Sequence, residues 1–331
     1  MDGLNARGVQ AVLLEHRSSR VDKAEWRCAL QPALPVRTAP EDYARYGSKI
    51  RKFLSAFAGL PRSAPFTLED PADIDHYATV IIGSDEVWNL KHPWYGREPL
   101  FFGRGLRADQ IASYAASFGN CSVPTGETTT WGDQLRRLKF ISVRDYNSQQ
   151  LVRKMIGCDA PIVLDPCLQF PEVVRAASTD APDLEPFIAV YGHSFPCWFQ
   201  DNVRQWARDT RRRLISIGYR NDWADEQRIE IGPEEFPPLL AASDAVATNF
   251  FHGCVLSIVN QRSFACCLSD YRSNKIADLA QLVGAGANIM TETSAHSEYQ
   301  RALGLPLAAS VFRNIDCIRQ GSERYLDNVL H

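Results

Sequence analysis

The stretch AVATNFFHGCVLSIVNQ, residues 245–261, decides how the rest of the chain is interpreted. Its first four residues, Ala245–Thr248, are a short apolar run of the kind that forms a buried strand. After a polar and aromatic turn, Phe251, Val255 and Ile258 recur at spacings of four and three residues, which places them on one face of a helix. The sequence therefore predicts a strand, a short loop and a helix.

The predicted start of this helix is suited to binding an anion. The first-turn N–H groups of a helix have no backbone partners, and the positive end of its dipole points outward. His252 lies there, and an imidazole beside a bound anion can donate a hydrogen bond to it or pass it a proton. Its neighbours Asn249, Phe251 and Gly253 are candidate binding residues. The alternative interpretation of His252 is a buried histidine that caps the loop.

Strands alternating with helices extend outward from this unit in both directions. Beyond a poorly patterned N-terminal region, a stretch without apolar periodicity, Gln169–Pro186, is rich in Pro, Ala and Asp and is expected to be a hinge. The pattern predicts two α/β domains, residues 1–174 and 175–331. The expected strands are Ala78–Ile82, Ile111–Ser117, Phe140–Val143, Pro161–Leu164, Phe187–Tyr191, Arg213–Gly218 and Ser263–Leu268. The expected helices are Glu41–Phe57, Pro124–Leu138, Ser148–Ile156, Phe199–Arg211, Pro238–Ala242, Lys275–Val283 and a terminal amphipathic helix with Val311, Ile315, Ile318, Tyr325 and Val329 on its apolar face.

The first residues depart from this regular alternation. Asn5–Leu14 has the composition of a glycine-containing loop that runs into a helix, yet only four residues precede it. A strand would normally feed such a loop. We therefore expect the first strand of the N-terminal domain to be missing, or the sequence to begin after it.

A second group of polar residues follows the expected strands of the N-terminal domain. Gly83, Ser84 and Asp85 come directly after one strand, Ser117 ends the next, and Arg144 ends the third. Ligands of open α/β sheets bind at the carboxyl ends of strands. An arginine there can hold a carboxylate or phosphate through two parallel hydrogen bonds, whereas its alternative is a surface ion pair with Asp145 or Asp165.

An aromatic residue in the loop after the first of these strands has two interpretations. Trp88 is a candidate for stacking on a sugar ring. The alternative is that it anchors its own loop, which loop aromatics commonly do.

Composition excludes several classes of protein. The formal net charge of −3 over 331 residues gives no electrostatic reason to expect nucleic acid as a partner. The nine cysteines form no CxxC pair and no zinc-type spacing, so no metal site is expected, and Cys266 and Cys267 are interpreted as packing groups in a buried strand. No apolar run is long enough to span a bilayer, and residues 1–20 are too charged for a signal peptide. We expect a cytoplasmic protein, for which peripheral association with a membrane stays open.

Seven short motifs together resemble the polysaccharide pyruvyl transferase family. They are VIIGSDEVWN (80–89), SYAASFG (113–119), ISVRD (141–145), VLDPCL (163–168), GPEEF (232–236), TNFFHG (248–253) and SNKIADL (273–279). They follow the order of the family and cover the chain from about residue 78 to 284. The N-terminal Asn5–Leu14 segment is similar to the family's Asn/Gly loop without its preceding strand.

The resemblance implies two Rossmann-like domains that face a cleft, as in GT-B glycosyltransferases. The N-terminal domain is then the acceptor side, and the last helix is expected to cross back onto it. It implies transfer of pyruvate from phosphoenolpyruvate onto two hydroxyls of a saccharide or lipid-linked oligosaccharide, as a ketal, with no cofactor besides this donor, in cell-surface or exopolysaccharide biosynthesis. The histidine of the family corresponds to His252, its donor-binding arginine to Arg144, and a basic residue before the last helix to Lys275. These three residues are expected to converge on one anion site although they lie in different domains. Asn249 and Phe250 depart from the Asp and Ser that are usual there, and the first change removes a carboxylate that would orient His252. Ser263 also replaces a common proline.

Two other functions remain open from the sequence. The first is a nucleotide-sugar-dependent glycosyltransferase of the same architecture, in which Glu234 or Glu235 would bind a ribose and His252 a diphosphate. The second is a saccharide-binding relative without catalytic activity, which the missing strand and the changes at Asn249 and Phe250 would fit. Competition by a nucleoside diphosphate would indicate the first, and a lack of phosphate release with any acceptor would indicate the second.

Overall fold

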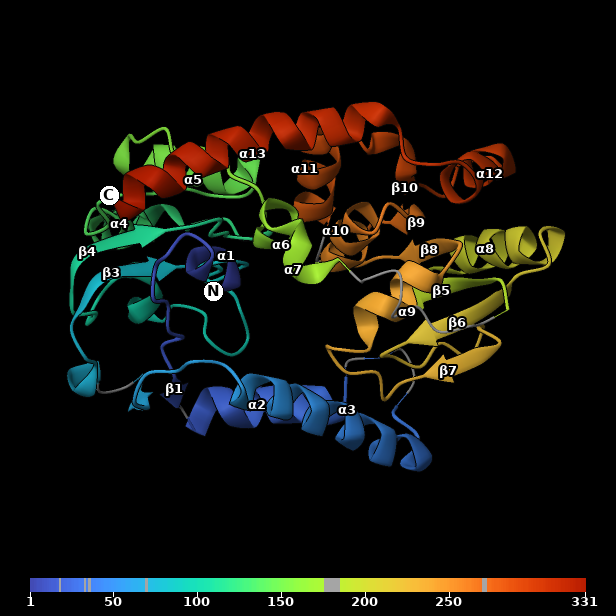
Figure 1. Cartoon of the computed structure of the whole chain (residues 1–331), viewed down its shortest axis with the longest axis horizontal. Coiled ribbons are helices and arrows are strands. Elements are labelled where there is room, and N and C mark those ends of the chain that lie inside the picture. The colour runs from blue at the N-terminus through green and yellow to red at the C-terminus, as the bar shows by residue number, and fades with distance from the viewer. Residues whose placement is uncertain (18, 33, 35–36, 69–70, 176–184, 270–272) are drawn as a thin grey trace. The chain divides into compact units, whose positions relative to one another are not determined.

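A computed structural model describes residues 1–17, 19–32, 34, 37–68, 71–175, 185–269 and 273–331 of the chain (Figure 1). Within these ranges the protein is of mixed α/β class, as expected, with thirteen α-helices and parallel strands. The chain divides into two compact units, each assembled from separated segments. Unit 1 comprises Met1–Glu25, Pro61–Phe170 and Arg313–His331, and unit 2 comprises Trp26–Leu60 and Pro171–Phe312.

Unit 2 contains a six-stranded parallel sheet whose strands lie in the order β10-β9-β8-β5-β6-β7. Every residue of β8 and β9 is buried, which explains why these strands are continuous apolar runs without polar alternation. The strands are β5 (Phe187–Tyr191), β6 (Arg213–Ile217), β7 (Glu226–Arg228), β8 (Ala245–Thr248), β9 (Ser263–Cys267) and β10 (Ile289–Met290).

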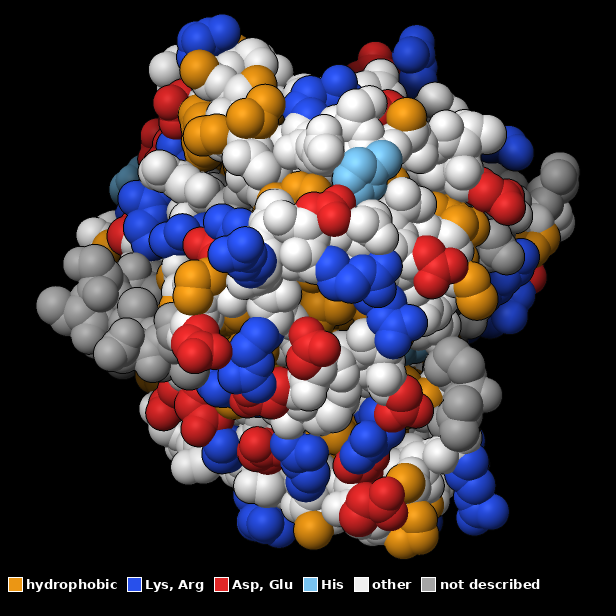
Figure 2. Space-filling view, turned by 90° about the vertical axis from the view of Figure 1, so that its right-hand side faces the viewer, with side chains coloured by type: hydrophobic (Ala, Val, Ile, Leu, Met, Phe, Trp, Pro, Cys, Tyr) orange, Lys and Arg blue, Asp and Glu red, His pale blue; other side chains and the backbone are white. Residues whose placement is uncertain are grey.

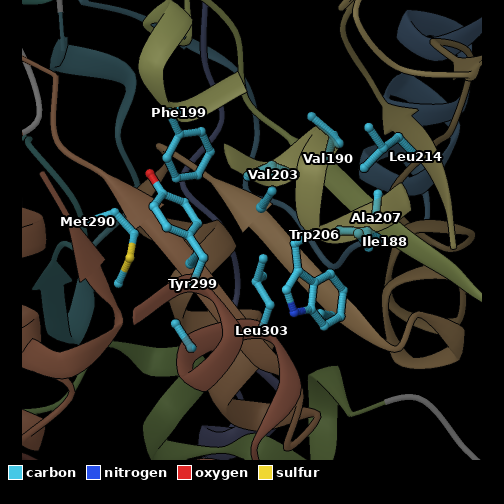
Figure 3. Close-up of a cluster of buried hydrophobic side chains, with 14 of the residues drawn as sticks. Ile188, Val190, Phe199, Val203, Trp206, Ala207, Leu214, Met290, Tyr299 and Leu303 are labelled. Atoms are coloured by element: carbon cyan, nitrogen blue, oxygen red, sulfur yellow. The ribbon is translucent and has the colours of Figure 1, made fainter. Parts of the chain in front are cut away.

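Helices α8 and α12 form one core of unit 2 against this sheet (Figures 1 and 3). Phe199 from α8 and Tyr299 from α12 are both fully buried there, with ring centroids 5.9 Å apart. Removing a ring of this size from a packed core costs about 3–5 kcal/mol. The helices of unit 2 are α3 (Pro40–Ala58), α7 (Pro171–Val174), α8 (Cys197–Asp209), α9 (Phe236–Ala242), α10 (Phe251–Val259), α11 (Ser273–Val283), η5 (Gly286–Asn288) and α12 (His296–Gly304).

Unit 1 is built on the parallel pair β3 (Tyr77–Ile82) and β4 (Ala108–Ser113). The last helix, α13 (Ala309–Leu330), contributes Arg313 onward to this unit, where the Tyr325 hydroxyl donates to the Ser113 carbonyl at 2.6 Å. Ser322 of the same helix accepts from the Leu164 N–H at 3.0 Å. The other elements are α1 (Asp2–Asn5), β1 (His16–Arg17), β2 (Phe66–Thr67), η1 (Pro71–Asp73), η2 (Pro99–Phe102), η3 (Thr125–Glu127), α4 (Thr128–Leu135), α5 (Tyr146–Ile156) and α6 (Pro166–Gln169), while α2 (Ser19–Leu30) begins in unit 1 and ends in unit 2.

The strand expected at Ile111–Ser117 is displaced toward the N-terminus, since β4 ends at Ser113. Ala115 has a φ of 53°, in the left-handed region, which ends the extended backbone.

The strands expected at Phe140–Val143 and Pro161–Leu164 are reduced to isolated parallel bridges, Ala112–Phe140, Ala116–Val143 and Val143–Ile162. Here serine hydroxyls make hydrogen bonds that backbone groups would make in a regular strand pair. The Ser142 N–H donates to the Ser113 hydroxyl at 3.0 Å, and the Ser142 hydroxyl donates to the Ser113 carbonyl at 3.0 Å. All three bridges are parallel, but these two segments are not regular strands.

The helix expected within Asn5–Leu14 is wrong. Gly8 has a φ of 76°, the left-handed conformation that commonly follows a helix end, and α1 stops at Asn5. The residues after it are extended: Leu13 pairs with Arg62, and β1 pairs with β2 in a separate two-stranded parallel sheet. A short first strand therefore exists, and helix α2 begins at Ser19, two residues after its end.

Most other expected elements are confirmed within one to three residues, including α3, α5, α8, α9, α10, α11 and α13. The Asp145 side chain caps α5 as expected, because it accepts from the Ser148 N–H at 2.7 Å. The hinge expected at Gln169–Pro186 lies largely outside the described residues, which stop at Arg175 and resume at Glu185.

The charged side chains at the surface and the cysteines agree with the expectations from composition. On the face presented in Figure 2, positive and negative side chains are interspersed. All nine cysteines are free, and Cys266 and Cys267 are buried in β9. Every helix of the described residues is too short or too polar to cross a lipid bilayer.

Candidate functional site

The sheet of unit 2 has a topological switch point between β5 and β8. From β5 the chain moves outward to β6 and β7, and it then returns to the other side of β5 to form β8, β9 and β10. In doubly wound sheets with this order, ligands bind outside the carboxyl ends of the strands at the switch point. Two loops lie there, one after Tyr191 at the end of β5 and one after Thr248 at the end of β8.

The turn from β8 into α10 is held by Thr248 and by the absence of a side chain at Gly253. The Thr248 hydroxyl donates to the Tyr191 carbonyl at 2.6 Å and accepts from the Phe250 N–H at 3.0 Å. A Cβ at Gly253 would lie 2.0 Å from that hydroxyl oxygen. Only glycine lets the first turn of α10 approach the end of β8 this closely.

Asn249 joins the two loops of the switch point. Its side chain is buried, and its amide donates to the His193 carbonyl at 2.7 Å. Its carbonyl oxygen lies against Gly192, where a Cβ would come within 2.2 Å. Gly192 has a φ of 146° and leaves the space that this amide fills. A carboxylate could not donate to the His193 carbonyl, so the amide at this position has a structural use here.

His252 and Lys275 both lie near the Phe251 ring. The rings of Phe251 and His252 are perpendicular, with centroids 5.3 Å apart, and the Lys275 ammonium lies 5.9 Å from the Phe251 ring centroid. Phe251 is buried, whereas His252 and Lys275 are each half-buried. The first turn of α10 receives no hydrogen bond from the side chain of its N-cap residue, Phe250. Unit 2 thus brings together an imidazole, an ammonium and the start of a nine-residue helix.

Arg144 in unit 1 is a buried cation surrounded by carboxylates. Its side chain is only 2% exposed, and it pairs with Asp85 and, at 3.4 Å, with Asp165. Burial by itself lowers the pKa of this guanidinium, but the charges of Asp85, Asp165 and Asp145 offset that effect and leave the pKa above its usual value. The ion pair with Asp165 considered from the sequence is present, but it lies inside the unit and not at its surface.

The loop after β3 places Gly83, Ser84 and Asp85 beside this arginine. The Gly83–Ser84 peptide bond is cis, and Gly83 has a φ of 138°. A Cβ on Gly83 would lie 2.1 Å from the Tyr114 carbonyl oxygen, so the close approach of the two backbones requires glycine. The Asp85 carbonyl accepts from the Ser117 N–H at 2.9 Å, which fixes the loop against the end of β4.

Ser117 and Trp88 support this loop from inside unit 1. The Ser117 hydroxyl donates to Asp145 at 2.5 Å and accepts from the Gly119 N–H at 2.8 Å. Trp88 is fully buried, its ring packs on Phe102 and Phe118, and its indole N–H donates to the Phe101 carbonyl at 2.7 Å. In this structure the tryptophan anchors the loop, and its ring faces are covered by protein.

The predicted convergence of Arg144 with His252 and Lys275 on one anion site stays a prediction, because Arg144 belongs to unit 1 and the other two to unit 2. The sequence did not indicate two residues that the structure places near the switch point, His193 and Lys49. A signal for His193 was present, since Gly192-His193-Ser194 directly follows the strongly apolar strand Phe187–Tyr191.

Comparison with known proteins identifies the family. The family model of polysaccharide pyruvyl transferase matches residues 3–271. The chain belongs to the polysaccharide pyruvyl transferase family. No curated protein matches it in sequence. The matched part of the chain contains the Arg144 group and the β8–α10 turn, whereas Lys275 lies just beyond it. Membership implies a transferase that acts on a saccharide, which agrees with the resemblance drawn from the seven motifs.

Proposed function

We propose that this protein transfers pyruvate from phosphoenolpyruvate onto two hydroxyls of a saccharide, forming a cyclic ketal and releasing phosphate. The observation that carries the proposal is the position of His252, at the start of α10 and at the switch point of the unit 2 sheet. The donor has a phosphate and a carboxylate. Lys275 and the first-turn N–H groups of α10 offer the positive charge and the backbone donors that bind such groups.

The reaction needs one acid and two sugar hydroxyls. A proton is added to the methylene carbon of the donor, so that C2 becomes electron-deficient and the first hydroxyl adds to it. The second hydroxyl then displaces phosphate, which leaves with its bridging oxygen. The two hydroxyls release two protons: one balances the proton added to the methylene carbon, and the other goes to the departing phosphate. His252 is the proposed acid, because imidazole can hold and give up a proton near neutral pH. In unit 1, Arg144 is proposed to neutralise donor charge.

We place this reaction in the cytoplasm, in the biosynthesis of a cell-surface or secreted polysaccharide, with a free or lipid-linked oligosaccharide as acceptor. The nine free thiols suit a reducing compartment.

The test is phosphate release from phosphoenolpyruvate with a panel of glycan acceptors, followed by mass analysis of the product. A ketal adds the mass of pyruvate less one water, and in deuterated water its methyl group should gain one deuterium per turnover. His252→Ala should lower the rate about 10²–10⁴-fold, the usual contribution of a positioned acid, with a much smaller effect on donor binding.

His252→Gln separates the two roles of this side chain. Glutamine can hydrogen-bond a phosphate but cannot act as an acid, so we expect it to be nearly as slow as alanine. If glutamine restores most of the rate, His252 is an anion ligand and the proton comes from elsewhere. Absence of phosphate release with every acceptor, together with intact saccharide binding, would instead indicate a binding protein.

A further inference from the structure

Lys49 of α3 reaches the carboxyl end of β6 in unit 2. Its ammonium donates to the Gly218 carbonyl at 2.7 Å and lies 4.4 Å from the centroid of the Tyr219 ring and 5.2 Å from that of Tyr46. An ammonium has three N–H donors, and this bond uses one of them. Lys49 is half-buried and makes no ion pair with any of the described residues.

The other cations that α3 directs at this part of unit 2 have carboxylate partners. Lys52 pairs with Glu235 at 2.6 Å, and Arg45 pairs with Glu230 at 2.7 Å. The nearby Arg220, from the loop after β6, is paired with Asp42 of α3. Lys49 is therefore the cation of this group whose charge the described part of the protein does not balance. Its burial lowers the pKa of the ammonium from 10.5 to about 8, which leaves it mostly charged at neutral pH.

Four half-buried rings gather beside Lys49 at the carboxyl ends of β5, β6 and β8. Phe250 is their centre, with ring centroids 5.2 Å from Tyr191, 5.3 Å from His193 and 5.3 Å from Tyr219, all at steep angles. The Lys49 ammonium lies over the face of the Tyr219 ring. A group of aromatic rings with polar edges and one adjacent cation can stack on the face of a sugar and bind an anionic substituent of it. This ring cluster adjoins the switch point, and its central residue, Phe250, directly precedes the first residue of α10.

We propose that Lys49 and the ring cluster of Tyr191, His193, Tyr219 and Phe250 form a subsite for a negatively charged saccharide, with Lys49 binding its phosphate or carboxylate group. That the ligand is a saccharide rests on the proposed function, whereas its negative charge is inferred from Lys49. The acceptor class is thereby narrowed to saccharides that carry a phosphate or a carboxylate near the hydroxyls that react.

The test measures binding by titration calorimetry at pH 7 with three probes, a hexose 1-phosphate, a hexuronic acid and an uncharged methyl hexoside. We expect the wild type to bind the two charged probes more tightly than the neutral one, and their ranking identifies phosphate or carboxylate as the preferred group. Lys49→Met should weaken the charged probes about tenfold to a hundredfold, as for loss of a hydrogen bond to a charged group, and leave the neutral probe unchanged. Lys52→Met is the matched control from the same helix and should change none of them.

Two further measurements separate a loss of binding from a loss of folding and test the role of the rings. Lys49→Met removes a buried charge and keeps the side-chain length, so its unfolding midpoint in urea should not fall. Tyr219→Leu should weaken all three probes, because it removes a ring on which the sugar stacks.

The proposal is overturned if Lys49→Met and Lys52→Met bind the charged probes alike, or if the wild type does not distinguish charged from neutral probes. It is also overturned if Lys49→Met weakens phosphoenolpyruvate binding but not that of the charged saccharides, since Lys49 would then serve the donor. Charge-dependent saccharide binding without any phosphate release would refute the proposed reaction and leave the subsite standing.

Discussion

At the scale of single residues, two glycines in helices show how the same substitution can have opposite effects. Gly253→Ala would bring a methyl group to 2.0 Å from the Thr248 hydroxyl and 2.8 Å from its Cβ, so the start of α10 must shift. We expect a loss of about 1–3 kcal/mol in the free energy of unfolding, as for overpacking of a well-packed interior. Urea denaturation monitored by circular dichroism measures it.

Gly321→Ala is the matched control, within α13. No atom lies within 4 Å of the position that its Cβ would occupy. Alanine should therefore raise the free energy of unfolding by about 0.5–1 kcal/mol through its higher helix propensity. Equal effects of the two substitutions would contradict the close packing described at Gly253.

The buried ammonium of Lys49 predicts a dependence of stability on pH. Its pKa in the folded state, about 8, is below the unfolded value of 10.5, so the folded state binds fewer protons between these two pH values. Stability from this group is therefore lowest below pH 8 and rises as the pH increases toward 10.5, by up to about 3 kcal/mol. Tyrosines also titrate in this pH range and change the stability. They are the same in the wild type and in Lys49→Met, so their contribution cancels in the difference between the two proteins.

The measurement is the difference in the free energy of unfolding between these two proteins from pH 7 to pH 10. We expect this difference to shift in favour of the wild type as the pH rises. Parallel curves would show that Lys49 has an ordinary pKa in the folded protein.

Some features of single residues could be predicted from the sequence and others could not. The Thr248–Gly253 turn could be predicted because strand, loop and helix are adjacent in the chain. The position of Lys49 could not, since its hydrogen bond to Gly218 joins residues 169 apart and no local pattern encodes that contact. The burial of Arg144 was also missed, because a strand-terminal arginine has the same sequence signal at a surface and inside a unit.

At the scale of elements, α3 is attached to the end of the unit 2 sheet by a buried ion pair. The Asp42 carboxylate is 1% exposed and accepts two hydrogen bonds from the Arg220 guanidinium. Those hydrogen bonds, despite partial burial, raise the pKa of Arg220. Arg220→Ala would leave the Asp42 carboxylate buried without this partner, and we expect it to cost about 3–5 kcal/mol of folding stability.

Arg213→Ala is the comparison for Arg220→Ala. Arg213 pairs with Glu226 at 2.9 Å, but its side chain is 49% exposed. Exposed pairs contribute about 0–1 kcal/mol, so urea denaturation should detect little change. A similar small loss for Arg220→Ala would mean that α3 is not anchored by this pair.

Elements were predicted well where periodicity decides and poorly where side chains replace backbone pairing. Continuous apolar runs gave β5, β8 and β9, because strands buried on both faces have no other pattern. The segments around Phe140–Val143 are as apolar, but serine hydroxyls make the bonds that a regular ladder would make. The hydrophobicity of a segment does not indicate whether its backbone or its side chains make the hydrogen bonds.

At the scale of the whole molecule, neither unit is a continuous stretch of chain. The chain passes from one unit to the other after Glu25, Leu60, Phe170 and Phe312. The sequence predicted two halves divided at residue 174, because strand and helix patterns carry no information about which segments pack together. The family resemblance, and not the pattern, was what indicated that the last helix packs on the first domain, and the structure assigns Arg313–His331 to unit 1.

Separate production of residues 1–174 and 175–331 tests how much the interleaving matters. The first fragment lacks the α13 residues that contact Ser113 and Leu164, and the second lacks α3 with Asp42 and Lys49. We expect neither to unfold cooperatively in urea when alone, and both to bind a hydrophobic dye. Cooperative unfolding of either isolated fragment, at the stability of the full chain, would show that the exchanged segments are dispensable.

The same interleaving sets the order of events when the protein is made. Arg45 and its partner Glu230 are separated by 185 residues, which a ribosome adds in roughly 10–40 s at about 5–20 residues per second. During that interval the amphipathic α3 has emerged without the sheet it packs on and is open to chaperones. Unit 1 waits longer still, because Arg7 can meet Asp327 only after 320 more residues have been added. The last segment of unit 1, Arg313–His331, is therefore added after every segment of unit 2.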